Sequence, residues 1–123
     1  MIIYSIIESP LHPDFSTLYK ERGINEVRLT SVRKAIQALK KQAPDYVMAD
    51  FIYGYGNNYA GVNISNLDVF LYSLDKYAPD CKVMVCYEKT DKDHVAKLKA
   101  LFPDIETLVY PVDKKHMQAL LTR

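Results

Sequence analysis

The chain has 123 residues, 49% of them hydrophobic, which suffices for one domain with its own core. It carries 16 lysines and arginines against 15 aspartates and glutamates, and this balance argues against nucleic acid or an anionic membrane as a main partner. Its apolar runs are shorter than the roughly 18 residues that a membrane-spanning helix needs, so we expect no membrane segment.

The opening residues and the two cysteines bear on where the protein works. The opening MIIYSIIESP lacks the positive start and the long apolar run of a secretory signal peptide. Cys81 and Cys86 fall in or beside one predicted strand, where they point to opposite faces and lie roughly 16 Å apart, too far for a disulfide. We therefore expect a cytoplasmic protein with reduced thiols.

The first part of the chain alternates predicted strands with predicted helices. Residues 2–7 are apolar and β-branched, as in a buried strand, whereas residues 25–30 alternate in the manner of an edge strand. Between them, Pro13 suits the first turn of a helix and Gly23 suits its end. Ser31 predicts the start of the next helix, because its hydroxyl can accept from the first unpaired backbone N–H groups.

The alternation continues with strands predicted over residues 45–51, 82–87 and 105–110. Apolar stripes at helical spacing lie between and after these strands. Ser65 and Asp68 form the pattern of a capping box at a helix start. Each of three connections from a helix to a strand contains a Pro-Asp pair, and proline stops a helix there.

This alternation predicts an α/β fold, a doubly wound five-stranded parallel sheet with helices on both faces, in the three-layer, flavodoxin-like arrangement. The strands that start at Ile2, Tyr46 and Val83 are the most apolar, so we place them centrally, in the order 2-1-3-4-5. We expect residues 1–123 to form a single domain.

Ligands of such folds bind outside the carboxyl ends of the strands, where the strand order reverses. That point lies between the first and third strands, and Glu8, Asp50 and the loop from Tyr53 to Asn63 all belong to it. The loop carries three tyrosines that are candidates for gripping a ligand or a partner: Tyr53, Tyr55 and Tyr59. Its glycines do not match the dinucleotide-binding pattern.

The order and spacing of the elements resemble the receiver domain of response regulators over nearly the whole chain. The most specific points are IIESP after the first strand, MADF at the end of the third and VYPVD after the fifth. Receivers hold Mg²⁺ with two acids after the first strand and accept a phosphoryl group on an aspartate that ends the third. They also place a serine or threonine at the end of the fourth strand and a lysine before a proline after the fifth.

The acidic positions match this resemblance in part. Asp50 stands where the phospho-acceptor would be. With Pro10 marking the register, Glu8 stands where the second metal-binding acid would be, but apolar Ile7 occupies the place of the first. The resemblance therefore implies at most a weak Mg²⁺ site on Glu8 and Asp50.

The other two positions depart from the family. Tyr87 falls at the Ser/Thr position, or Cys86 if the register shifts by one residue, and Tyr110 replaces the lysine. Tyrosine can donate a hydrogen bond but brings no positive charge, and phosphoryl transfer depends on neutralising charge. Tyr87 is also too bulky to act as the small hydroxyl that follows the phosphoryl group.

The resemblance thus predicts an atypical receiver, a pseudo-receiver of a signalling pathway, that binds a protein partner without normal phospho-switching and is not an enzyme. One alternative is a receiver that is still phosphorylated on Asp50 in a two-component phosphorelay. Another is a small-molecule binder at the cleft between the first and third strands. Receivers commonly pair through one face, which implies partner contact or a homodimer through Asp91 to Leu121. We expect no nucleic-acid or membrane partner.

The three histidines, His12, His94 and His116, fall on predicted helix starts or surfaces. We expect them to be exposed to solvent. The lysine-rich sides of the predicted helices are likewise expected to be ordinary solvated faces.

Overall fold

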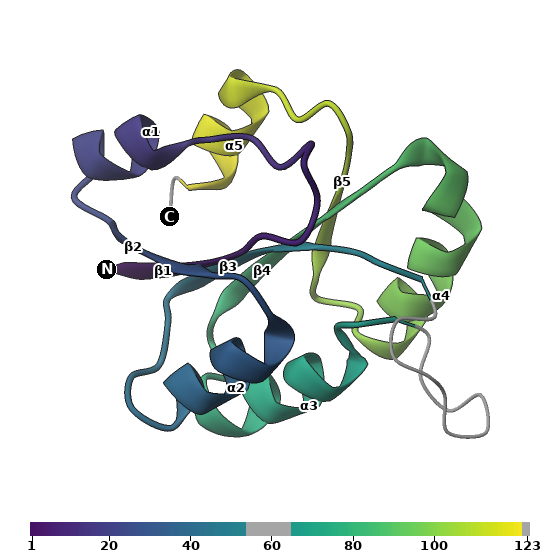
Figure 1. Cartoon of the computed structure of the whole chain (residues 1–123), viewed down its shortest axis with the longest axis horizontal. Helices are drawn as coiled ribbons and strands as arrows, with labels where there is room; N and C mark the ends of the chain where they lie inside the picture. The colour runs from purple at the N-terminus through teal and green to yellow at the C-terminus, as the bar shows by residue number, and fades with distance from the viewer. Residues whose placement is uncertain (54–64, 122–123) are drawn as a thin grey trace.

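A computed structural model describes residues 1–53 and 65–121 of the chain. Its strands form one parallel sheet in the order β2-β1-β3-β4-β5, which confirms the order expected from the sequence (Figure 1). The strands are β1 (Ile2–Ile6), β2 (Asn25–Leu29), β3 (Tyr46–Asp50), β4 (Lys82–Tyr87) and β5 (Glu106–Val109). The helices of the described residues are α1 (Ser16–Glu21), α2 (Val32–Leu39), α3 (Asp68–Tyr77), the 3-10 turn η1 (Lys89–Asp91), α4 (Lys92–Leu101) and α5 (Lys114–Leu120).

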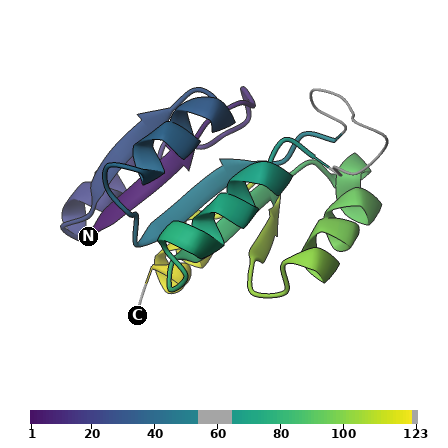
Figure 2. The ribbon, with the colours of Figure 1, turned by 90° about the horizontal axis from the view of Figure 1, so that it is seen from below.

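Helices cover both faces of the sheet. Figure 1 shows α1 and α5 on one face and α2 and α3 on the other, and Figure 2 shows α2 (blue) beside α3 (teal) in front of the strands. Alternate residues of a strand point to opposite faces, so each central strand supplies both cores. From β3, Val47 and Ala49 pack toward α2, α3 and α4, whereas Tyr46 and Met48 pack toward α1 and α5. Every residue of β3 is buried.

Local signals in the sequence set several helix boundaries. Gly23 follows α1 with a φ of 70°, a left-handed conformation that glycine adopts without strain. At the start of α2, the Ser31 hydroxyl accepts a hydrogen bond from the backbone N–H of Lys34 at 3.2 Å. Asp68 begins α3 and accepts from the N–H of Ser65 at 2.7 Å, which is one half of the predicted capping box. The Ser65 hydroxyl accepts from the N–H of Leu67 at 3.1 Å, and α3 itself starts after Leu67 without a side-chain cap.

The predicted strands run slightly longer than the observed ones. β5 ends at Val109 rather than at Tyr110, because Pro111 follows and has no N–H to continue the ladder. The N–H of Tyr110 still bonds the carbonyl of Tyr87 at 2.9 Å, which holds Tyr110 at the sheet edge. Among the described residues, no helix is both long and apolar enough to cross a membrane.

Candidate functional site

Asp50 ends β3 at the carboxyl edge of the sheet, as predicted, but it does not open to solvent. Its exposed fraction is 0%. By strand alternation it points to the same side as Met48, toward the connection between β1 and α1 and the connection between β5 and α5. The carboxylate therefore lies beneath those two connections.

Two backbone groups and two side chains donate to this carboxylate. The N–H groups of Glu8 and Ser9 donate to Oδ2 at 2.8 and 2.9 Å. Nδ1 of His12 lies 2.9 Å from Oδ1, and the Tyr110 hydroxyl also donates to Oδ1. Because an ionised carboxylate only accepts, Nδ1 is the ring nitrogen of His12 that carries a proton.

These donors decide the charge state of Asp50. Burial by itself raises the pKa of the carboxyl, but the hydrogen bonds from His12, Tyr110 and the Glu8 N–H outweigh it, and the pKa lies below its ordinary value. The pKa of Tyr110 is raised, first by burial and then by neighbouring Cys86 and Asp50. At neutral pH the pair is therefore a carboxylate and a neutral phenol.

Glu8 lies beside Asp50 but is held by a different residue. Its Oε1 accepts from the side-chain amide of Asn66 at 2.8 Å, and the same amide donates to the backbone carbonyl of Asp50 at 2.9 Å. Burial raises the pKa of Glu8, the Asn66 hydrogen bond lowers it, and the charge of Asp50 raises it further. The net effect is a raised pKa, and burial is its main cause.

Asn66 was not singled out from the sequence. Its side-chain oxygen accepts from the N–H of Ile52 at 3.0 Å, so this one amide joins the end of β3, the start of α3 and Glu8. The one local signal was its place inside the Ser65–Asp68 capping box, and that signal does not point to Glu8.

On β4, the residue beside Asp50 is Cys86. The register of the sheet places Cys86 directly opposite Asp50, and its side chain packs on the α1 and α5 side. Tyr87 packs against the opposite core instead. Of the two residues that the sequence left open, Cys86 therefore lies on the Asp50 side of the sheet and Tyr87 lies on the other. Burial, and then the charge of Asp50, raise the pKa of the Cys86 thiol to about 12, so it stays protonated.

The arrangement does not fit a magnesium ion on Glu8 and Asp50. A carboxylate offers about four lone-pair sites, and the four donors described above occupy those of Asp50. One oxygen of Glu8 is also taken. In residues 1–53 and 65–121, no group of three or more acidic, histidine or cysteine side chains could hold a metal ion.

The histidine expectation was wrong for His12. Its side chain is only 3% exposed, because the connection after β1 folds back over Asp50 and a buried carboxylate attracts a basic ring. His94 is half-buried and stacks on Tyr53, with ring centroids 3.6 Å apart and planes 16° apart. His116 is exposed, as expected.

Of the tyrosine loop, the structure places Tyr53, which is 55% exposed above His94. Tyr55 and Tyr59 lie outside the described residues, so their predicted role stays a prediction.

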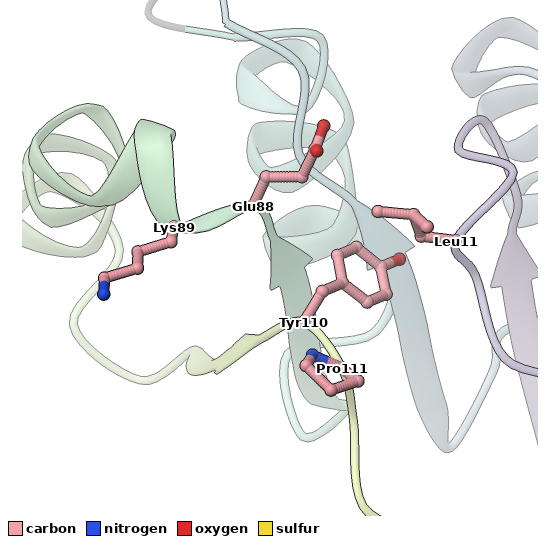
Figure 3. Close-up of a pocket in the computed structure, with 5 residues that line it drawn as sticks. All are labelled: Leu11, Glu88, Lys89, Tyr110 and Pro111. Atoms are coloured by element: carbon pink, nitrogen blue, oxygen red, sulfur yellow. The ribbon is translucent and has the colours of Figure 1, made fainter.

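A pocket of about 250 Å³ opens over the ring of Tyr110 (Figure 3). It is lined by Leu11, Glu88, Lys89, Tyr110 and Pro111. Figure 3 shows the Tyr110 hydroxyl pointing toward Leu11, while the ammonium group of Lys89 points away from it. Lys89 therefore does not supply the positive charge that Tyr110 lacks.

Among the comparisons with known proteins, only the comparison with solved structures finds similar proteins. No family model matches the chain, and no curated protein matches it. A response regulator receiver protein from Sinorhizobium medicae is 20% identical, with a TM-score of 0.68 over 98% of this chain and 90% of the other. A receiver domain protein from Clostridium thermocellum is 18% identical, with a TM-score of 0.67 over 97% and 88%.

An adenylate cyclase from Rhodopirellula baltica is similar too, at 15% identity and a TM-score of 0.65 over 96% of this chain and 81% of that one. At sequence identities this low, the similarity indicates a shared fold and does not indicate a shared activity. The chain has the fold of the response-regulator receiver domain, with a five-stranded parallel sheet in the same order.

Proposed function

We propose that this chain is an atypical receiver domain that works in signal transduction by binding a protein partner, without normal phosphoryl switching on Asp50. One observation carries the proposal. The carboxylate at the phospho-acceptor position is fully buried, and its lone pairs are engaged by donors of the same chain. A carboxylate in this state is built to hold two connections in place.

The chemistry of the neighbours supports the same proposal. Phosphoryl transfer requires an accessible attacking oxygen and cations that neutralise the charge on the transferred group. Tyr110 is a neutral phenol at physiological pH, burial raises its pKa further, and the ammonium group of Lys89 points away. The buried thiol of Cys86 is a weak hydrogen-bond donor and a poor substitute for a hydroxyl.

Partner binding through the face from Asp91 to Leu121 belongs to this proposal. Two apolar side chains of that face are well exposed: Leu101 on α4 is 50% exposed and Val109 on the edge strand β5 is 45% exposed. Exposed apolar side chains on a sheet edge and a neighbouring helix suit a protein contact. We propose the same face for a homodimer. We also propose that the protein is not an enzyme and that it acts in the cytoplasm.

Intact-mass spectrometry after incubation with acetyl phosphate and Mg²⁺ tests the phosphoryl part. We expect little adduct on the unmodified protein, and Asp50→Asn provides the matched control for labelling at other positions. A substantial base-labile adduct that maps to Asp50 would contradict the proposal. It would favour the phosphorelay function instead.

Light scattering across a range of concentrations tests the dimer part separately. We expect the apparent mass to rise with concentration and the rise to be lost in Val109→Lys, which places a charge on the edge strand. A strictly monomeric protein at all concentrations would remove the homodimer and leave the partner contact alone.

A further inference from the structure

Two of the three Pro-Asp pairs lie at the edge of the sheet where the strands begin, opposite the edge that carries Asp50. Pro79 and Asp80 lie between α3 and β4, and Pro103 and Asp104 lie between α4 and β5. The helices α3 and α4 cover the same face of the sheet, because their inward residues belong to one core (Figure 2). The two connections therefore meet on one side of the molecule, away from the site at Asp50.

A pocket of about 110 Å³ lies between these connections and the ends of α3 and α4. Most of its apolar lining is buried: Leu71, Leu74, Ala78, Val83, Phe102 and Ile105. It is smaller than a cavity of roughly 150 Å³ that binds benzene, and far smaller than the roughly 300 Å³ at which pockets for drug-sized molecules begin. The pocket thus has room for one aliphatic side chain. Pro79 and Pro103 also line it, and their fixed backbone angle limits movement of the rim.

Exposed apolar side chains extend this surface. Leu101, half exposed, lines the pocket, and on α3 Tyr72 is 60% exposed. The Tyr72 ring packs edge-on against Phe102, with ring centroids 4.9 Å apart. Val69, also exposed, lies three residues before Tyr72 and so on the same side of α3. An exposed aromatic ring beside an apolar pocket is typical of surfaces that bind another protein.

Among the described residues that line the pocket, the charged ones are Asp75 and Asp104. Both side chains are exposed. Within residues 1–53 and 65–121, neither carboxylate forms a hydrogen bond or an ion pair. The pocket therefore combines an apolar floor with two acids that can accept from a positively charged partner.

Two lysines of the same helices have other contacts. Lys99 on α4 donates to the backbone carbonyls of Pro103 and Ile105. The ammonium group of Lys76 on α3 lies 5.5 Å from the centre of the Tyr77 ring. Neither lysine neutralises the two acids at the pocket through an ion pair.

We propose that this pocket docks a basic segment of a protein partner. One aliphatic side chain of the segment enters the pocket, and arginine or lysine side chains on either side of it pair with Asp75 and Asp104. Arginine suits this surface best, because its guanidinium binds a carboxylate with two hydrogen bonds and also stacks on an aromatic face such as Tyr72. The inference goes beyond the proposed function. It adds a second contact surface, which shares only Leu101 with the exposed apolar pair of α4 and β5.

The test uses three short synthetic peptides as probes. Each carries one leucine in a run of alanines, and the leucine is flanked by two arginines, two glutamines or two glutamates. Amide NMR signals of the whole chain report where a peptide binds and how tightly. We expect the arginine peptide to shift the signals of Leu74, Cys81 and Leu101 in a saturable manner. The glutamine peptide should bind about fivefold more weakly, the effect of losing two exposed ion pairs, and the glutamate peptide more weakly still.

The matched change in the protein removes the two charges and keeps the size of the side chains. In the double variant Asp75→Asn with Asp104→Asn, the arginine peptide should lose about fivefold in affinity, and the glutamine peptide should bind as before. Both acids are exposed, so we expect the variant to fold. Glu21→Gln changes an exposed acid on α1, on the other face of the sheet, and should alter neither affinity (Figure 1).

A fourth peptide tests the pocket itself. It keeps the two arginines and has serine in place of leucine, so it loses the apolar side chain that fills the pocket. We expect its affinity to fall by about tenfold or more. Equal binding of the leucine and serine peptides would reduce the contact to charge attraction and overturn the inference. Equal binding of the arginine and glutamate peptides would overturn it as well.

The absence of saturable binding by the arginine peptide, or shifts confined to residues away from the pocket, would also defeat the inference. These results leave the proposed function standing, because phosphoryl labelling of Asp50 takes place at the other edge of the sheet. Conversely, an adduct on Asp50 would defeat the proposed function and leave the docking pocket unaffected.

Discussion

Asp50 and Asp68 are two buried aspartates that this chain uses in different ways. Asp50 is 0% exposed and Asp68 is 1% exposed. The contacts shown for Asp68 come from Ser65, three residues away, through its N–H and its hydroxyl. The side-chain donors to Asp50 come from His12 and Tyr110, 38 and 60 residues away in the chain.

The comparison teaches that the same residue type can serve one helix or a whole edge of a sheet. Asp68 ties the turn at Ser65 to the start of α3, a local contact that a capping pattern already indicates. Asp50 ties the connection after β1 and the connection after β5 to the end of β3. Removing Asp68 should therefore disturb one helix end, whereas removing Asp50 should release two connections at once.

The largest expected effect is that of Asp50→Ala. It leaves the N–H groups of Glu8 and Ser9, the Tyr110 hydroxyl and the His12 ring without their acceptor inside the protein. We expect the free energy of unfolding to fall by about 3 kcal/mol, the upper end of the cost of leaving buried donors without an acceptor. Urea denaturation measures it, and a loss no greater than that of Asp68→Ala would contradict the anchoring role.

The pH dependence of stability should also depend on Asp50. Its folded pKa lies below the ordinary 3.8, so the ionised carboxylate stabilises the fold above that value. The contribution is lost as the pH falls through the lower, folded pKa. Thermal melts from neutral to acidic pH should show a steep loss of stability below pH 3.8, and this loss should be shallower in Asp50→Asn. The same loss of stability at acidic pH in both proteins would argue against the lowered pKa.

Glu8 should change stability with pH in the opposite sense. Its folded pKa is raised above 4.5, so its contribution is present below that value and is lost as the pH rises through the folded pKa. In the same melts, Glu8→Gln should therefore lose less stability than the unmodified protein between pH 4.5 and neutrality. Comparing Asp50→Asn with Glu8→Gln checks that the two acids change the pH dependence of stability in opposite directions.

Tyr110→Phe should have an intermediate effect. It keeps the ring that lines the pocket and removes the hydroxyl that donates to Asp50. Loss of one hydrogen bond to a charged group costs about 1.5 kcal/mol, which urea denaturation can resolve. Tyr77→Phe, on an exposed tyrosine of α3, is the matched control and should leave the stability nearly unchanged.

The smallest effect should be that of Asp68→Ala. Loss of the acceptor for the Ser65 N–H and hydroxyl costs about 1 kcal/mol, and the amide signals that change should cluster at the start of α3. Signals of Glu8, Ser9 and Tyr110 should stay in place. If those signals shifted as much as the ones near Ser65, Asp68 would not act only locally, and its contrast with Asp50 would be wrong.

The sequence by itself determined the sheet and several of the helix boundaries. The prediction of Pro13 in the first turn of a helix was wrong, because α1 begins at Ser16. The apolar, β-branched runs of β1, β3 and β4 favour central strands because both faces are buried, and the observed order confirms this. Gly23, Ser31 and the Ser65–Asp68 pair acted through contacts within a few residues, which a pattern can predict. The place of Asp50 at the end of β3 followed in the same way.

The tertiary structure alone decided what surrounds Asp50. Burial of His12 and the bridge made by Asn66 depend on how connections far apart in the chain fold over one sheet edge. The place of Cys86 beside Asp50 depends on the register between β3 and β4. No periodicity encodes these contacts, because a one-residue shift in register turns every side chain of a strand to the other face. The aspartate could be found from the sequence, but its donors are chosen by the packing of the whole chain.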